Sequence, residues 1–364
     1  MKNLTFKTGA IAVAAAVSIA LTAPAQAADF SGKKVTLLVP YGEGGGSDTV
    51  ARLLQPHLEK NLPGNPTVVV LNQPGGGGVK GSNKFDAAGP KDGTMLIVAS
   101  SSGHLSFALG GKGVRFDETK WRGVVGFPRG AVIYTNAEQT GAMGKDPKAD
   151  VAALKKATVI NGSKTPIAVE LLDTLTMEML GVDNKTVFGL STSKQRQAFW
   201  RGEINLNNDG SGVYTQKVAS AQEGAKPTAL FTYGAPTDDG GFERDPDHMD
   251  TPHFLEYYKA ATGKDASGTE LEVFKNLFAI KVALSKALAL PAGTPQDIVD
   301  AWVDAMKKSY ADPEVKKALA KEFGGMKPQF GKAAERALAD GLKISDESKE
   351  YLNKLLQRKY NATL

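Results

Sequence analysis

The chain has 364 residues, with 44 Lys and Arg against 39 Asp and Glu, and it contains no cysteine. This length suffices for two domains that each bury a core, and the missing cysteine excludes disulfides and cysteine nucleophiles. The net charge of +5 is spread thinly along the chain. Because there is no basic run, the sequence does not support nucleic-acid binding, and the mild excess favours an anionic small molecule.

The first 27 residues have the pattern of a secretory signal peptide. Lys2 and Lys7 give a basic start, residues 10–23 are apolar, and Ala25-Gln26-Ala27 matches the cleavage pattern of two small residues around a third. The apolar run is too short and too rich in alanine to span a membrane. We therefore expect export to the periplasm and cleavage after Ala27.

A strand, a glycine loop and a helix open the mature chain. Residues 35–39 are apolar and β-branched, Pro40 ends the run, and apolar residues recur at helical spacing from Val50. This arrangement leaves backbone N–H groups at the positive end of a helix dipole, which favours an anion. Both nucleotide motifs fail, since Ser47 and Asp48 replace the P-loop Lys-Ser/Thr pair and Ser47 replaces the third glycine of the dinucleotide fingerprint. A carboxylate stays possible, and so does a plain βα turn.

Two further strands follow the same pattern. Residues 67–71 and 94–99 are apolar, and they lead into the loops 72–78 and 100–104, which are rich in glycine, serine and asparagine. Strands that alternate with helices indicate a parallel α/β sheet, whose carboxyl edge is where ligands bind.

The second half of the chain predicts another α/β unit. Residues 124–135 are strand-like around Pro128, and residues 157–160 form a strand that opens through the loop 161–166 onto a helix ending near residue 180. Further strands are expected at 187–190, 204–211 and 228–233, and helices at 150–156, 194–201, 254–261, 296–310, 315–323 and 333–356. Residues 235–270 are an irregular excursion, and residues 277–290 are apolar and strand-like in part.

Five short motifs resemble one known family. They occur in order at residues 39–52, 68–77, 92–94, 290–295 and 312–315, beginning with Val39-Pro40-Tyr41. In this combination the chain resembles the substrate-binding receptors of tripartite tricarboxylate transporters, also called Bug or TctC-like proteins. The resemblance implies a two-lobed periplasmic-binding-protein fold, α/β and type II-like, with the ligand in the cleft between the lobes. Lobe 1 is then residues 29–127 plus 284–364, lobe 2 is residues 128–283, and the chain crosses between them twice.

The resemblance also implies a ligand site. A small carboxylate is expected to lie between the loop after the first strand and the facing loop of lobe 2, without a cofactor or a metal. The ligand-binding residues predicted in this way are Tyr41, Gly44, Gly45, Gly46, Ser47, Asp48, Ser101, Ser102, His104, Ser163, Lys164, Thr165 and Asp209. The expected partners are the carboxylate and the membrane subunits of a transporter, with no nucleic acid, and the receptor is expected to be a monomer.

Some residues depart from the family or allow another interpretation. The family usually has phenylalanine at the position of Tyr41, and Glu43 places a negative charge beside the proposed anion site. His104 fits either a ligand contact or the cap of a turn. The acidic and histidine residues between positions 243 and 253 match no metal motif, so we expect a solvated acidic loop.

Two other classes of function stay open. One is a periplasmic ligand sensor for a two-component system, which would differ from a transport receptor in its genomic neighbours. The other is a hydrolase, although the chain lacks a Gly-x-Ser-x-Gly nucleophile elbow and has only four histidines. Activity on esters or amides would distinguish it, and we expect no enzymatic activity.

Overall fold

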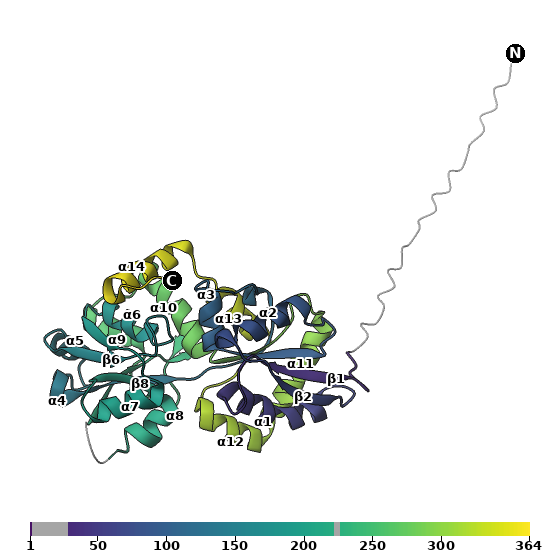
Figure 1. Ribbon diagram of the computed structural model, residues 1–364, viewed down its shortest axis with the longest axis horizontal. Coiled ribbons are helices and arrows are strands. Elements are labelled where there is room, and N and C mark those ends of the chain that lie inside the picture. Colours follow the sequence, from purple (N-terminus) through teal and green to yellow (C-terminus); the bar gives the residue numbers. More distant parts are fainter. Residues whose placement is uncertain (2–27, 222–225) are drawn as a thin grey trace.

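The computed structural model describes Met1 and residues 28–221 and 226–364, so the predicted signal peptide lies outside the described residues. The chain folds into two α/β lobes, each built on its own sheet (Figure 1). We call the part around the six-stranded sheet lobe 1 and the part around the five-stranded sheet lobe 2. Of the helices in the described ranges, none is long and apolar enough to cross a membrane.

The sheet of lobe 1 has the strand order β13-β4-β12-β3-β1-β2. Strand β1 runs parallel to β2 and β3, as predicted for successive βα units, whereas β12 is antiparallel to both β3 and β4. A strand from late in the chain therefore completes the middle of this sheet. The strands are β1 (Lys34–Val39), β2 (Thr67–Asn72), β3 (Met95–Ser100), β4 (Arg122–Phe127), β12 (Lys286–Leu290) and β13 (Gln329–Phe330).

Helices cover both faces of this sheet because its strands are apolar on both sides. Leu37 of β1 points to one face and packs with Leu54 and Trp302, whereas the next residue, Leu38, belongs to the core on the other face with Phe85. The first face carries α1 (Gly46–Asn61), α11 (Gln296–Ala311) and α12 (Pro313–Phe323), and the second carries α2 (Val79–Ala88), α3 (Ser101–Ala108) and α13 (Lys332–Gly341). Short helical turns lie at η1 (Gly76–Gly78) and η2 (Glu118–Lys120).

The sheet of lobe 2 has the strand order β7-β6-β8-β5-β9. Strand β6 is parallel to β7 and β8, and β5 is antiparallel to β8 and β9. The strands are β5 (Ala131–Asn136), β6 (Val159–Gly162), β7 (Asn184–Val187), β8 (Leu206–Gly210) and β9 (Pro227–Thr232). The excursion after β9 contains a two-stranded hairpin of β10 (Ala235–Pro236) and β11 (Phe242–Glu243).

Lobe 2 is also layered, with helices on both faces of its sheet (Figure 1). Ile133 of β5 packs on one side with Leu175 and Phe274, and its neighbour Tyr134 packs on the other with Phe199. The first face carries α5 (Pro147–Leu154), α6 (Leu171–Met179), α9 (Phe254–Thr262) and α10 (Gly268–Phe278), which continues into η4 (Ala279–Ala283). The second carries α7 (Thr192–Trp200), α8 (Ser211–Val213) and η3 (Tyr214–Val218), while the short helix α4 (Ala137–Thr140) follows β5.

Two connections between the lobes run side by side. The chain leaves lobe 1 between β4 and β5 and returns between η4 and β12, and the backbone N–H of Arg129 donates to the carbonyl of Val282 at 3.0 Å. We propose that the lobes divide near residues 128 and 284, within these connections.

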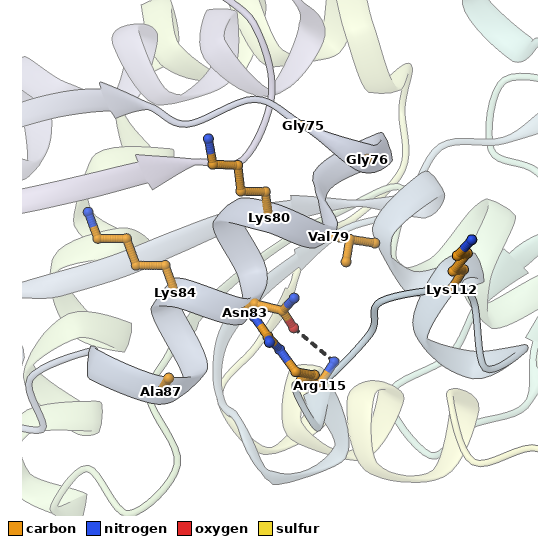
Figure 2. A pocket seen from close by; sticks show the side chains of 9 residues that line it. All are labelled: Gly75, Gly76, Val79, Lys80, Asn83, Lys84, Ala87, Lys112 and Arg115. Carbon is orange, nitrogen blue, oxygen red and sulfur yellow. Dashed lines mark hydrogen bonds between the residues drawn. The ribbon is translucent and has the colours of Figure 1, made fainter.

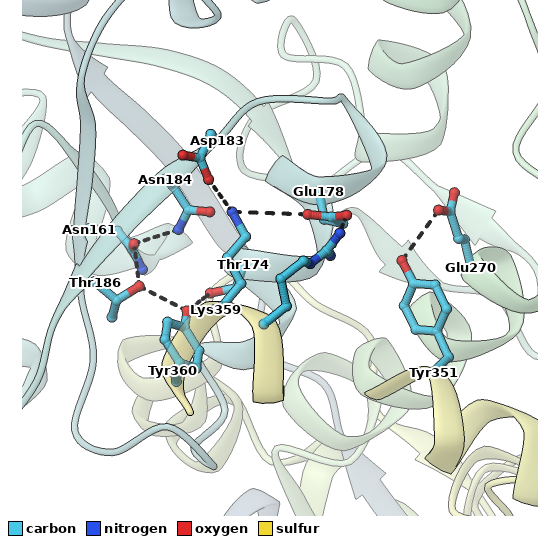
Figure 3. Close-up of polar contacts among 11 residues, drawn as sticks. Asn161, Thr174, Glu178, Asp183, Asn184, Thr186, Glu270, Tyr351, Lys359 and Tyr360 are labelled. Carbon is cyan, nitrogen blue, oxygen red and sulfur yellow. Dashed lines mark hydrogen bonds and ion pairs between the residues drawn. The ribbon is translucent and has the colours of Figure 1, made fainter. Parts of the chain in front are cut away.

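The last helix makes a third crossing. Helix α14 (Asp346–Tyr360) follows α13 of lobe 1 but packs on α10 and α6 of lobe 2 (Figures 1 and 3). The Tyr360 hydroxyl lies 2.7 Å from that of Thr174 and 2.8 Å from that of Thr186, and Arg358 donates to Glu178 at 2.6 Å. The prediction that residues 284–364 lie wholly in lobe 1 is therefore wrong for α14, since its apolar face and its cations find their partners on lobe 2.

Two predicted elements are also shifted. Strand β7 ends at Val187, where the sequence analysis begins a strand, because the polar residues Asn184 and Thr186 take the ladder positions beside β6. The segment 277–290 is helical as far as residue 283, and only its end forms β12. An apolar run by itself fits a buried helix as well as a buried strand.

Candidate functional site

A cavity of about 260 Å³ lies between the two sheets. Its wall combines the end of β3 and the start of α3 in lobe 1, the loop after β6 and the end of β8 in lobe 2, and both connections. The residues that line it are Ser100, Ser101, Ser102, Arg129, Gly130, Ala131, Lys164, Val169, Glu170, Thr192, Asn208, Gly210, Lys281, Ser285 and Lys286. Because both lobes contribute, hinge motion would open or close this cavity.

Four cations line this cavity. Lys281 is neutralised by Asp173, whose carboxylate lies 2.5 Å from its ammonium group and also accepts from Asn208 at 2.6 Å. By contrast, Arg129, Lys164 and Lys286 form no ion pair within the part of the chain that the structure describes. The cavity therefore has an excess of positive charge.

Lys286 is held in an unfavourable environment for a cation. Burial lowers the pKa of its ammonium group to about 8; Glu322 opposes this change, and the positive charge of Arg129 adds to it. Two cations that line one cavity repel each other, and an anion placed between them relieves that repulsion. This pair makes the cavity electrostatically suited to an anion.

The position of Arg129 depends on a glycine in the facing lobe. A methyl group placed on Gly210 would lie 2.8 Å from Nε and Nη2 of Arg129, so the guanidinium packs directly against the backbone at the end of β8. The backbone of Arg129 is tied to Val282. Arg129 is therefore held at the point where lobe 1, lobe 2 and both connections meet.

The first glycine loop does not line this cavity. Its Gly44 N–H donates to the carboxylate of Asp48 at 2.8 Å, and Arg52 and Asn72 donate to the same carboxylate at 3.0 Å. Asp48 is thus an internal anion that occupies one of the donors predicted for the ligand. The loop still lies next to the site, since a methyl group on Gly46 would come within 3.5 Å of the Lys286 side chain.

Three of the predicted residues line the cavity, namely Ser101, Ser102 and Lys164. Tyr41 packs instead between Gly78 and Gly103, where a methyl group on either glycine would lie 2.9 Å from its ring or hydroxyl. Tyr41 thus supports the segment 100–104 from behind and does not line the cavity. Ligand contacts from Gly45, Gly46 and Ser47 stay predictions.

The remaining predicted residues are engaged with other protein groups. His104 is fully buried and paired with Glu118, and Asp209 is buried and accepts from Arg196 and from the Tyr134 hydroxyl. Neither residue lines the cavity, so ligand contacts from His104 and Asp209 stay predictions. Ser163 donates to the carbonyl of Thr165 at 2.9 Å, and the Thr165 hydroxyl donates to that of Ile167 at 3.0 Å, so both hydroxyls shape the loop that presents Lys164.

Sequence reasoning missed Arg129, Glu170, Lys281 and Lys286. Arg129 was detectable as the single cation in the apolar segment around Pro128, and Lys281 and Lys286 as the two cations in the apolar run from residue 277 to residue 290. An unpaired charge in a buried segment is costly, so its presence there is a signal of function. Nothing local marks Glu170, because it reaches the cavity only through the fold of lobe 2.

A larger hollow of about 480 Å³ lies on the outside of lobe 1 (Figure 2). Its cations are Lys80, Lys84, Lys112 and Arg115, and their side chains spread over α2 and the loop after α3. All four are exposed, and only lobe 1 contributes. Exposed charges hold a small anion weakly because solvent screens them, so the interlobe cavity is the better candidate site.

The acidic excursion differs from its prediction. Asp245 is fully buried. One of its carboxylate oxygens accepts a hydrogen bond from the Ser211 hydroxyl, and the other accepts one from the backbone N–H of Asp247. The interpretation as a solvated loop is wrong for Asp245, which anchors the excursion beside the connection at Gly130. Among the described residues, no group of three potential ligands is placed to hold a metal ion.

The chain is similar to known proteins in part of its sequence and in its fold. No family model matches the chain. Protein BugT of Bordetella pertussis is 37% identical over 89 residues, which are 24% of this chain and 26% of BugT, so the match spans about a quarter of that relative. A TctC solute-binding protein from Polaromonas, solved without ligand, superposes with a TM-score of 0.66 at 18% identity, over 89% of this chain and 98% of the other. The chain has the fold of the Bug and TctC solute-binding proteins.

Two further structures of this fold contain ligands. MatC from Rhodopseudomonas palustris with bound malate has a TM-score of 0.53 at 19% identity, and it matches 89% of this chain and 98% of its own. An R. palustris protein with adipate has a TM-score of 0.56 at 17% identity, and it matches 89% and 97%. The resemblance to Bug/TctC receptors and the two-lobed periplasmic-binding-protein fold are thus confirmed.

Proposed function

We propose that this protein is a solute-binding protein that captures a small carboxylate in the cavity between its lobes. The observation that carries the proposal is the pair of Arg129 and Lys286, two cations that line the same cavity and form no ion pair in the described structure. A carboxylate between them accepts charge-assisted hydrogen bonds, each worth about 1.5–3 kcal/mol net. Two or three such bonds support a micromolar affinity, about −8 kcal/mol.

The size of the cavity favours a small ligand. Its volume of about 260 Å³ is below the range of about 300–1,000 Å³ that is usual for drug-sized ligands. The malate and adipate in two proteins of the same fold are small dicarboxylates, which supports the same ligand class here. The hydroxyls of Ser101, Ser102 and Thr192 supply further hydrogen-bond donors at the wall.

The setting is proposed to be transport in the periplasm. The pattern of residues 1–27 predicts export, and the relatives are named as solute-binding or periplasmic proteins, which supports a receptor for the membrane subunits of a tripartite tricarboxylate-type transporter. We propose a monomer without enzymatic activity and without a cofactor. Intact mass of the exported protein tests the leader, since a retained 1–27 segment would contradict cleavage after Ala27.

A thermal-shift screen followed by calorimetric titration tests the binding function. The panel contains succinate, malate, adipate, citrate, aspartate and benzoate, with glucose as an uncharged control. We expect at least one carboxylate to raise the melting temperature and to bind with a Kd near the micromolar range. A protein that binds none of these acids and instead hydrolyses ester substrates would overturn the proposal.

A further inference from the structure

One carboxylate in the cavity wall has no role in binding an anion. Glu170 precedes α6 and is only 4% exposed, and it lines the same cavity as Arg129 and Lys286. Its Oε1 accepts a hydrogen bond from Gln195 at 3.2 Å, whereas Oε2 has no hydrogen-bond partner within residues 28–221 and 226–364. A buried carboxylate oxygen that lacks a donor is destabilising, because the hydrogen bonds it made to water are not replaced.

The local structure does not account for this carboxylate. Glu170 stands at the N-cap of α6, but its side chain makes no capping hydrogen bond. It forms no ion pair with any described residue, in contrast to Asp173 one turn later, which is paired with Lys281. A ligand that is only an anion would be repelled by Glu170, because like charges destabilise each other in a water-poor site.

The cavity wall therefore has charges of both signs that form no ion pair within the described residues. Arg129, Lys164 and Lys286 are positive, and Glu170 is negative. An ammonium group on a ligand suits an ionised carboxylate, since the hydrogen bond between them is charge-assisted.

We propose that the ligand is an acidic amino acid, with its carboxylates toward Arg129 and Lys286 and its ammonium group on Glu170. This inference rests on the proposed function and narrows its substrate class. Glu170 is then a specificity-determining residue, which accepts a hydrogen bond from the ligand amine and disfavours the same acid without an amine.

Aspartate and succinate form a matched pair of probes, because they have the same carbon skeleton and differ only by the ammonium group. Malate, which carries a hydroxyl in its place, separates a neutral donor from a charged one. Calorimetric titration of the unmodified protein is expected to rank aspartate above malate and malate above succinate, with at least tenfold between the first and the last.

The variant Glu170→Gln keeps the size of the side chain and removes its charge. We expect it to weaken aspartate binding at least tenfold and to leave succinate binding unchanged or tighter. Glu272→Gln, an exposed carboxylate on α10, is the matched control and is expected to change neither ligand.

Equal affinity for succinate and aspartate in the unmodified protein would overturn the inference, and that comparison holds even if Glu170→Gln does not fold. A variant that keeps the full preference for aspartate would overturn it as well. If succinate, malate or adipate binds and aspartate does not, only this inference fails. If no carboxylate binds, the proposed function fails with it.

Discussion

The carboxylate of Asp48 accepts a hydrogen bond from the backbone N–H of Gly44 at 2.8 Å, so the first glycine loop contains its own anion. Arg52 and Asn72 complete the surroundings of this carboxylate. The loop that the sequence marks as an anion site is thus partly satisfied from within. Arg129, Lys164 and Lys286, which form no ion pair in the described structure, line the cavity between the lobes instead.

Asp48→Ala is expected to destabilise the protein by about 1–3 kcal/mol, because a buried carboxylate with three donors is removed. Urea unfolding measures this change. The matched control is Arg52→Ala, which removes a half-exposed partner and is expected to cost less than about 1 kcal/mol. Equal losses of unfolding free energy in the two variants would show that Asp48 stabilises the protein only through its ion pair with Arg52 and not through the glycine loop.

The same carboxylate predicts a pH dependence of stability. Hydrogen bonding from Arg52 lowers the pKa of Asp48 in the folded protein, and the bonds from Gly44 and Asn72 act in the same direction against the cost of burial. Its contribution to stability is therefore full above the unfolded pKa of about 3.9 and is lost as the pH falls through the lower folded value. The loss of stability below pH 4 is expected to be smaller in Asp48→Ala.

Tyr360→Phe tests the crossing of α14 onto lobe 2. The hydroxyl of Tyr360 contacts Thr174 and Thr186, which belong to two elements of lobe 2, and its loss is expected to cost about 1 kcal/mol of unfolding free energy. Tyr351→Phe on the same helix removes only a 3.3 Å contact with Glu270 and is the control. If Tyr360→Phe is no worse than this control, the polar contacts of Figure 3 do not fix the helix on lobe 2.

Gly210→Ala tests the placement of Arg129. The backbone at Gly210, with φ −58° and ψ 144°, tolerates alanine, but the new methyl group meets the guanidinium at 2.8 Å. Since the guanidinium is the mobile end of a side chain, we expect it to move, with a stability change under about 1 kcal/mol and about tenfold weaker carboxylate binding, or about 1.4 kcal/mol. Gly212→Ala, where the methyl group meets nothing within 4 Å, is expected to bind normally.

Lys286 predicts how ligand affinity depends on pH. Because burial lowers its pKa to about 8, we expect adipate binding to weaken as the pH rises from 7 to 9, while the ammonium group loses its proton. Without ligand, Lys286 binds more protons in the unfolded chain than in the folded protein between about pH 8 and 10.4. Its contribution to folding stability therefore rises with pH across that range. Lys286→Arg is expected to bind adipate with little change between pH 7 and 9. A wild-type affinity that stays constant would contradict this role.

Much of the fold follows from local patterns. The apolar residues 35–39 fall within β1, and the loops after β1, β2 and β3 follow from glycine, serine and proline after each strand. Local periodicity says less about where an element docks. Helix α14 has the pattern of an amphipathic helix, but only long-range partners such as Thr174 place it on lobe 2.

The site was predicted less well than the fold. Ser101, Ser102 and Lys164 follow strands and reach the cavity, because strand ends converge at the facing edges of the two sheets. Arg129 lies in the first connection and Lys286 at the start of β12, 157 residues later in the sequence, and no spacing rule joins them. The binding role of the first loop rested on free N–H groups, and one of these is taken by Asp48, four residues after Gly44.

Calorimetric titration of Lys286→Met and Lys84→Met with the tightest-binding carboxylate of the panel tests the central claim. Both variants remove one lysine charge, the first from the interlobe cavity and the second from the exposed hollow of Figure 2. We expect Lys286→Met to lose at least tenfold in affinity, about 1.4 kcal/mol, and Lys84→Met to bind as the unmodified protein does. Full affinity in a folded Lys286→Met, together with a loss in Lys84→Met, would place the carboxylate site outside the cleft.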